Sequence, residues 1–413
     1  MEVDVNENVK KPKVRFKGYE DAWEQRKVSD IATITAGGTP STSKPSYWKP
    51  KEIPWLSSGE VHKKYVTETD NMISEEGLNN SSAKWIEEGS VLIALAGQGK
   101  TRGTAAIARI PLTTNQSIAA IKFDESVSPD YAFQNLDSRY DELRNISSGD
   151  GTRGGLNKQL LSDLEITLPT LEEQKKLGDY FYTLDHLITL HQRECEQAKK
   201  YKKYMLQKMF PQNGSNVPEI RFSGFTYAWE QRKLPEFVTF YNGQTYTPDD
   251  VQESGTLVLR SSNVKNGEIV DADNVYINPE IASADNVQEG DIIVVVRNGS
   301  RALIGKHAQI KDPKPNTVIG AFMSGMRSEH SSFVNALLDT SAFENEIAKN
   351  MGATINQITG YMFSKMEFVI PTDDEQEKIG EYFANLDHLI TLHQQKCEEL
   401  QKIKKFMLQN MFV

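Results

Sequence analysis

The sequence predicts a mixed α/β protein that contains two copies of one unit, each copy ending in a long α-helix. Three observations lead to this fold class. Two phrases recur along the chain at nearly the same offset, short apolar runs indicate strands in the first part of each copy, and a helical apolar spacing covers the last part. The 413 residues suffice for two or three domains with real hydrophobic cores.

The duplication rests on the two repeated phrases. Arg-Phe-x-Gly followed by Ala-Trp-Glu-Gln-Arg-Lys occupies residues 15–27 and returns 206 residues later at 221–233. Nine residues, Leu-Asp-His-Leu-Ile-Thr-Leu-His-Gln, are identical at 184–192 and 386–394, which are 202 residues apart. Because the two offsets nearly agree and exceed the period of a solenoid repeat, we interpret the chain as a tandem duplication.

The first part of each copy, residues 28–168 and 234–370, is called here the first and second front domain. Apolar runs at 91–96 and 292–296 each follow a Glu-Gly turn and are typical of buried strands. Stretches rich in Gly, Ser and Thr, such as 37–43, indicate loops between strands. The two front domains match weakly beyond these features, and a mixed α/β fold fits both.

A long helix is predicted at the end of each copy. Pro169-Thr170 and Pro371-Thr372 mark its start, and acidic residues follow in the first turn, where the helix dipole favours them. Apolar or small residues then recur at spacings of three and four, interrupted once by Lys202 and Lys404. We expect the two helices to pack on each other as an antiparallel coiled coil. The predicted seam consists of Leu177, Phe181, Leu184, Ile188, His191, Cys195, Ile379, Phe383, Leu386, Ile390, His393 and Cys397.

These features divide the chain into six expected parts. They are an N-terminal tail (1–12), the first front domain with its lead-in (13–168), the first long helix (169–210), a linker (211–218), the second front domain with its lead-in (219–370) and the second long helix (371–413).

If an approximate twofold axis crosses the helix pair at mid-length, His191 lies next to His393. A separation above ~10 Å, beyond neighbour contact between packed helices, would contradict this.

Composition restricts the function classes. Apolar runs are far shorter than the ~20 residues of a membrane span, no secretory signal is visible, and two cysteines cannot build a disulfide framework, so we expect a cytoplasmic protein. The formal net charge of −10 argues against a surface that binds polyanions everywhere, although it permits a local basic groove.

No catalytic or metal-binding constellation is found. His186 and His191 are five residues apart, whereas ligands on one helix face are spaced by four. Cys195 and Cys397 lie on the predicted seam and lack a neighbouring base, so a small buried hydrophobe is the default interpretation. Residues 94–101 match a relaxed phosphate-binding loop, but the alternating apolar stretch after it predicts a strand instead of the helix that such a loop requires.

Polar loops of the front domains are better candidates for binding. Arg, Lys, Asn and Gln are the side chains that bind base edges in the DNA major groove, and Gly-rich loops permit close approach to a backbone or groove. For each residue the alternative, a solvated turn or a plain connection, stays open. The candidate contacts are Thr39, Ser41, Lys44, Tyr47, Gln98, Lys100, Arg102, Thr152, Arg153, Gln244, Tyr246, Arg297, Asn298, Arg301, Asn356 and Gln357.

The sequence resembles the specificity subunit of Type I restriction–modification systems over nearly its whole length. The resemblance lies in the phrases at 23–27, 37–41, 53–59, 115–117, 168–174 and 370–376, in this order and partly duplicated. It implies two target recognition domains, each binding one half of a split sequence in double-stranded DNA, and a helix pair that sets the unspecified spacer. The second copy lacks the Gly-Gly-Thr-Pro-Ser phrase of 37–41, which leaves its contact loops less defined.

The resemblance also implies partners. These are two modification subunits that bind S-adenosylmethionine and methylate adenine, and restriction subunits that use ATP and magnesium, whereas this chain binds none of these cofactors and catalyses nothing. A coiled-coil scaffold that binds protein or glycan but no DNA is the alternative, and salt-sensitive binding to duplex DNA distinguishes the two.

Overall fold

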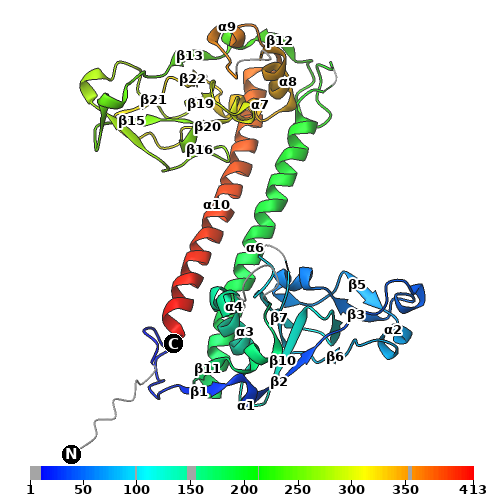
Figure 1. Ribbon diagram of the computed structural model, residues 1–413. Coiled ribbons are helices and arrows are strands. Elements are labelled where there is room, and N and C mark those ends of the chain that lie inside the picture. The colour runs from blue at the N-terminus through cyan, green and yellow to red at the C-terminus, as the bar shows by residue number, and fades with distance from the viewer. Residues whose placement is uncertain (1–10, 98–99, 147–154, 213, 352–355) are drawn as a thin grey trace, which may run out of the picture. The chain divides into compact units, whose positions relative to one another are not determined.

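The computed structural model describes residues 11–97, 100–146, 155–212, 214–351 and 356–413. The chain forms two compact units, each containing one front domain and parts of both long helices (Figure 1). The first unit comprises residues 1–190 and 396–413, and the second comprises residues 191–395. No described helix is long and apolar enough to cross a membrane.

The first front domain contains two sheets. The larger one has, in spatial order, β2 (Ala32–Ala36), β10 (Ile118–Phe123), β7 (Val91–Ala94), β8 (Ala105–Ala108) and β4 (Tyr65–Val66). The smaller one has β5 (Asn71–Ile73), β3 (Ile53–Leu56), β9 (Leu112–Thr114) and β6 (Trp85–Ile86). Strand β7 is fully buried, so the buried strand predicted at 91–96 is confirmed, ending two residues earlier, and it lies at the centre of the sheet between β10 and β8.

The second front domain repeats this arrangement. Its first sheet has β13 (Thr239–Asn242), β22 (Met323–Arg327), β19 (Ile292–Val295) and β20 (His307–Gln309). Its second sheet has β14 (Val251–Gln252), β18 (Val275–Ile277), β15 (Thr256–Leu259) and β21 (Thr317–Ile319), and β16 (Val264–Lys265) pairs with β17 (Glu268–Ile269). The β15–β21 pair is parallel, as is the β3–β9 pair of the first domain, so the two copies share the order β2-β10-β7-β8 (β13-β22-β19-β20) and β5-β3-β9 (β18-β15-β21). They differ at the sheet edges, where the first domain adds β4 and β6 and the second adds β14.

Short helices cover the sheets. They are α1 (Val28–Ile31), α2 (Glu75–Asn79), α3 (Pro129–Ser138), α4 (Tyr140–Ile146) and α5 (Lys158–Ser162) in the first unit, and α7 (Ser331–Leu338), α8 (Ser341–Asn350) and α9 (Gly360–Phe363) in the second. Helix α3 contributes Tyr131 and Phe133 to a core that also contains Ile93 of β7. In the second unit, Phe333 of α7 packs in the same core as Val294 of β19.

The first repeated phrase is explained by a strand pair that closes each front domain. Strand β1 (Glu24–Lys27) runs antiparallel to β11 (Glu165–Leu168), and β12 (Glu230–Lys233) runs antiparallel to β23 (Glu367–Ile370). The register is equivalent, since Glu24 lies opposite Leu168 and Glu230 lies opposite Ile370. The lead-in of each copy is therefore held against the strand that immediately precedes the long helix.

The two long helices are α6 (Leu171–Met209) and α10 (Asp373–Met411), with 39 residues each. Both begin immediately after the predicted Pro-Thr boundaries. Each unit contains one segment of each helix, and the segments contact one another inside the unit. In the second unit the Nδ1 atoms of His191 and His393 are 3.0 Å apart, which confirms the predicted proximity of these two side chains.

Candidate nucleic-acid interface

Three loops converge at the end of the central strand in both front domains. In the second unit, the Val296 N–H donates to the Phe322 carbonyl (3.0 Å), and the Ile358 N–H donates to the Val296 carbonyl (2.8 Å). In the first unit, the Leu95 N–H donates to the Ser117 carbonyl (2.8 Å), and the Leu156 N–H donates to the Leu95 carbonyl (3.2 Å). The same backbone framework therefore holds loops of different sequence.

This convergence brings together candidates that are far apart in the sequence of the second copy. Arg297 forms an isolated antiparallel bridge with Gln357, and the Asn356 side-chain amide donates to the Gly299 carbonyl (3.1 Å). The Asn298 side-chain amide donates to the Ser261 hydroxyl (3.1 Å). Arg301 follows on the same loop and is exposed. Four predicted contacts, Arg297, Asn298, Asn356 and Gln357, thus lie in one polar cluster.

The corresponding loop of the first copy carries Lys100 and Arg102. Lys100 is exposed, and its carbonyl accepts a hydrogen bond from the Tyr140 hydroxyl (2.9 Å), which ties the loop to α4. Arg102 is half-buried. The candidates Gln98, Thr152 and Arg153 lie outside the described residues. Strand β8 follows this loop and pairs antiparallel with β7, so a strand stands where a phosphate-binding loop requires the start of a helix.

A second loop, residues 37–48, is held by its own contacts. The Thr39 hydroxyl donates to the Gln116 side chain (2.5 Å), and Ser41 shares a hydrogen bond with Ser43 (2.8 Å). Lys44 donates to the Tyr47 hydroxyl (3.0 Å), and this hydrogen bond raises the pKa of Lys44. Lys44 and Ser41 are exposed, whereas the Tyr47 side chain is buried, so Tyr47 positions the lysine instead of offering its ring to a ligand.

Gln244 is a structural residue, which corrects its prediction as a base contact. Its side chain is buried, its amide nitrogen donates to the carbonyls of Thr245 (2.8 Å) and Ile281 (3.2 Å), and its oxygen accepts from the N–H groups of Ser283 (2.9 Å) and Ala284 (3.0 Å). Both ends of the amide are therefore occupied by the fold. Tyr246 is half-buried and packs against the core of the second sheet.

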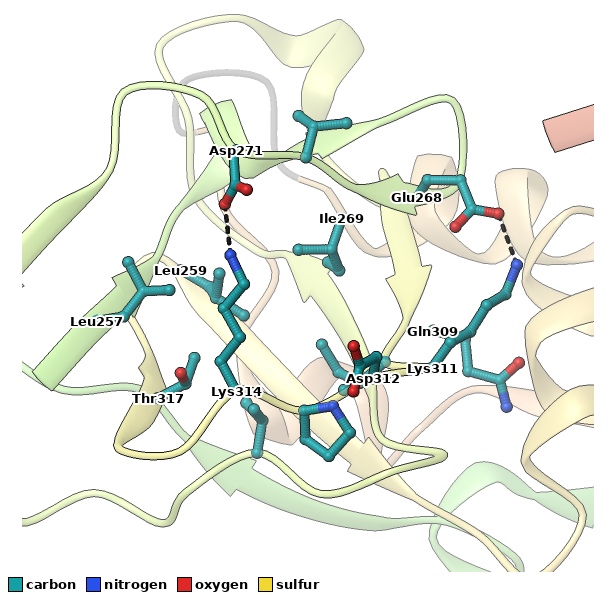
Figure 2. A pocket seen from close by; sticks show the side chains of 14 residues that line it. Leu257, Leu259, Glu268, Ile269, Asp271, Gln309, Lys311, Asp312, Lys314 and Thr317 are labelled. Atoms are coloured by element: carbon teal, nitrogen blue, oxygen red, sulfur yellow. Dashed lines mark hydrogen bonds and ion pairs between the residues drawn. The ribbon is translucent and has the colours of Figure 1, made fainter. Parts of the chain in front are cut away.

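A separate pocket of the second unit lies near the opposite end of β19, where Ile292 pairs with Gln309 (Figure 2). Leu257, Leu259 and Ile269 contribute apolar lining. Lys314 donates to Asp271 (2.7 Å) and Lys311 donates to Glu268 (2.6 Å), so both lysines in the lining are neutralised by carboxylates. Because its cations are paired in this way, the pocket is a poor candidate for phosphate binding.

Comparison with known proteins agrees with this duplicated architecture. The sequence model described as "Type I restriction modification DNA specificity domain" matches residues 20–200 and 227–402, which is most of the chain. The chain belongs to this family. It carries the family's domain twice, and each match extends from the lead-in strand into the long helix. Membership makes the chain a DNA-recognition subunit of the Type I kind and not a catalyst.

The chain is also similar to specificity subunits of Type I restriction enzymes. The chain is 24% identical over 290 residues to the Type I restriction enzyme MjaVIII specificity subunit of Methanocaldococcus jannaschii, covering 67% of both chains. It is 28% identical to the EcoR124I/EcoR124II specificity subunit of Escherichia coli over 47% of this chain and 49% of that protein. The crystal structure of the Type I S subunit from M. genitalium has a similar fold, with a TM-score of 0.69, 14% identity and coverage of 97% and 99%.

The predicted helix seam is buried in this member of the family, with three partial exceptions. Leu177 and Phe181 pack into the core of the first front domain, and Ile379 and Phe383 do the same in the second, so the seam binds front domains as well as the other helix. The remaining buried seam residues are Leu184, Ile188, Cys195, Leu386 and Ile390. His191, His393 and Cys397 are half-buried.

Sequence reasoning missed the role of the arginine that opens each repeat. Arg15 forms two hydrogen bonds of 2.8 Å with the Glu173 carboxylate, and Arg221 forms two of 2.7 Å with Glu375. Both carboxylates are buried in the first turn of a long helix. The repetition of Arg-Phe-x-Gly and of an acidic residue after Pro-Thr was visible, but nothing in the sequence indicated that they pair.

Proposed function

We propose that the chain binds a split sequence in double-stranded DNA, each front domain contacting one half, and that it positions methyltransferase and restriction subunits on that DNA. The observation that carries this proposal is the contrast between framework and loops. The inner strands of the sheets, the closing strand pairs and the loop-to-loop hydrogen bonds are equivalent in both copies, whereas the exposed side chains on the converging loops differ. Two equivalent supports with different polar loops suit two half-sites of different sequence.

We further propose that α6 and α10 pack as an antiparallel coiled coil that sets the spacer between the half-sites. Contacts within each unit support this. In the first unit Asp185 pairs with Lys404 of α10, and the ring centroid of Phe181 is 5.5 Å from that of Phe412, the residue that follows α10. The later of the two α6 residues therefore meets the earlier of the two C-terminal residues. In the second unit Cys195 contacts Ile390 and Lys202 contacts Asp387, so here too the residue numbers fall along α10 as they rise along α6.

The nine-residue phrase supports two identical partner subunits. The buried positions of the phrase include Ile188 and Ile390, and their burial explains why both copies carry isoleucine there. Leu190 and Leu392 belong to the same phrase but are 38% and 49% exposed, and packing within this chain does not explain why both are leucine. We assign this surface to a helix of the modification subunit, which would bind once to each copy. S-adenosylmethionine, ATP and magnesium act on the partner subunits in this proposal, and the complex works in the cytoplasm.

The decisive experiment is a base-resolution map of methyladenine in the source genome, with and without this gene. Loss of one split motif that is methylated in both halves would support the proposal and identify the target. If no motif changes, purified complexes should be tested for binding to duplex DNA. A complex that lacks salt-sensitive, sequence-specific binding would favour the alternative of a protein-interaction scaffold.

Exchange of residues 28–168 for the front domain of another family member tests modularity. The methylated motif should change in one half only, because the second front domain is left intact. A change in both halves would contradict independent recognition by the two copies.

A further inference from the structure

An exposed aromatic side chain lies inside the candidate interface of the second unit. Phe322 is 55% exposed and immediately precedes β22. Its carbonyl accepts hydrogen bonds from the N–H groups of Val296 (3.0 Å) and Arg297 (3.2 Å), so the backbone beside the ring is tied to the start of the Arg297 loop. The exposed ring lies among the polar loops of the candidate interface and is accessible to a ligand bound there.

The Arg297 guanidinium lies over this ring, with Cζ 5.1 Å from the ring centroid. The bridge to Gln357 holds the arginine backbone from the other side. Two other arginines of this unit are neutralised, since Arg260 pairs with Asp273 and Arg327 with Asp291. Among the described residues no carboxylate lies within salt-bridge distance of Arg297. Its planar fork is therefore oriented by stacking while its hydrogen-bond donors remain available to an acceptor outside the chain.

We infer that the half-site bound by the second front domain contains a guanine and a thymine in adjacent base pairs, with Arg297 on the guanine and Phe322 on the thymine methyl group. This inference rests on the proposed function. Guanine presents the O6 and N7 acceptors that fit an arginine fork, and thymine presents the one methyl group of the major groove. The Arg297 Cζ and the Phe322 ring centroid are 5.1 Å apart, which is between one and two base-pair steps of about 3.4 Å, so the two side chains suit neighbouring base pairs.

The first front domain lacks an aromatic side chain at the position equivalent to Phe322. The carbonyl equivalent to that of Phe322 belongs to Ser117, which accepts from the Leu95 N–H (2.8 Å). A serine offers a hydroxyl but no apolar ring to a methyl group. Recognition of the thymine methyl through this position is therefore confined to one half-site.

The test uses the full chain assembled with its modification subunits and duplexes that carry the methylated motif. Replacing the thymine by uracil removes only the methyl group, and replacing the guanine by 7-deazaguanine removes only the N7 acceptor. Each change should weaken binding of the unsubstituted complex. Phe322→Ala should remove the preference for thymine over uracil at that one position. Arg297→Ala should reduce discrimination for guanine by about 5- to 150-fold, the range of a bidentate base contact.

Tyr227→Ala is the matched control, because this aromatic residue of the second unit is 80% exposed and lies on the lead-in outside the interface. It should leave all base preferences unchanged. The inference is overturned if this half of the motif lacks adjacent guanine and thymine, or if both interface variants keep the original base preferences while binding the motif. If the unsubstituted complex does not bind its motif specifically, the proposed function itself fails and the inference with it.

Discussion

The two units contain equivalent lysines at the helix contact, but the surroundings of these lysines differ. In the first unit Lys404 donates to both carboxylate oxygens of Asp185 (2.6 Å each), and Asp185 also accepts from Tyr65 (3.0 Å) and Gln134 (2.9 Å). In the second unit Lys202 donates to Asp387 and to Asp339 (2.6 Å each). Each lysine comes from the helix of one copy and its helical aspartate from the other.

The two networks differ in how far their side chains are buried. The side chains of Lys404 and Asp185 are 9% and 10% exposed, whereas Lys202, Asp387 and Asp339 are 13%, 22% and 33% exposed. Burial and the charge of nearby Lys64 lower the pKa of Lys404. Burial also disfavours the charged form of Lys202, but Asp339 and Asp387 outweigh it and raise its pKa. The same ion pair is therefore shielded from solvent in the first unit, where we call its network closed, and is more exposed to solvent in the second.

The largest loss of stability is expected when the carboxylate of the first unit's network, that of Asp185, is removed. Asp185→Ala should lower the free energy of unfolding by about 3–5 kcal/mol, because it leaves buried Lys404 next to Lys64 with only the more distant Asp137 (3.9 Å) as a partner, and Asp137 is already paired with Lys64 (2.7 Å). Asp387→Ala should cost about 1–2 kcal/mol, since Asp339 still pairs with Lys202 and water reaches the site. Hydrogen exchange of the assembled complex, resolved along the sequence, assigns each loss to its unit. Equal losses would show that the difference in burial has no energetic consequence.

For the Arg15–Glu173 and Arg221–Glu375 pairs we expect equal losses of stability in the two units, because the two pairs are buried to the same extent. Arg15→Ala and Arg221→Ala should each cost about 2 kcal/mol by removing charge-assisted hydrogen bonds to a buried carboxylate. Arg15 and Arg221 side chains are both 13% exposed, and their glutamates are 1% and 0% exposed. Chemical unfolding of the two variants should give losses that agree within error. A clear difference would mean that the two lead-ins are held differently.

The sequence predicted those parts of the molecule that depend on local chemistry. The Pro-Thr boundaries and the apolar spacing located both long helices within two residues, and apolar runs located β7 and β19. It did not predict pairs made by folding, such as Arg15 with Glu173 or Arg297 with Gln357, because sequence spacing contains no information about which loops meet. Lys202 and Lys404 interrupted the predicted seam, and only the structure shows that each is paired with aspartates.

A smaller effect concerns pH. His307 is buried beside Asp339, with Nε2 3.4 Å from the carboxylate, while the first unit has Lys64 on the equivalent Asp137 (2.7 Å). Burial and Lys202 disfavour protonated His307, but Asp339 and the Gly305 carbonyl outweigh them and raise its pKa above the ordinary 6.5. Its stabilising contribution is therefore complete below about pH 6.5 and is lost as the pH rises through the raised pKa. Each tenfold gain in proton affinity on folding corresponds to about 1.4 kcal/mol of this contribution.

Hydrogen exchange across pH 6 to 9 should therefore show the second unit weakening with rising pH, whereas Lys64, at the equivalent position of the first unit, has a raised pKa and contributes no such loss. His307→Gln serves as the control, because it should abolish the pH dependence of the second unit. If that dependence persists in the variant, it originates elsewhere in the unit.

The smallest expected effect concerns the closing strand pairs, where the copies are equivalent and solvent-exposed. The Gln25 side chain donates to Glu165, and the Gln231 side chain donates to Glu367, in the same cross-strand position. Gln25→Ala and Gln231→Ala should each change the free energy of unfolding by less than about 0.5 kcal/mol, because water replaces the lost partner at an exposed site. Thermal unfolding of both variants beside the unsubstituted chain measures this. A loss above about 1 kcal/mol in one copy alone would show that its closing strand pair has a structural role that the other copy lacks.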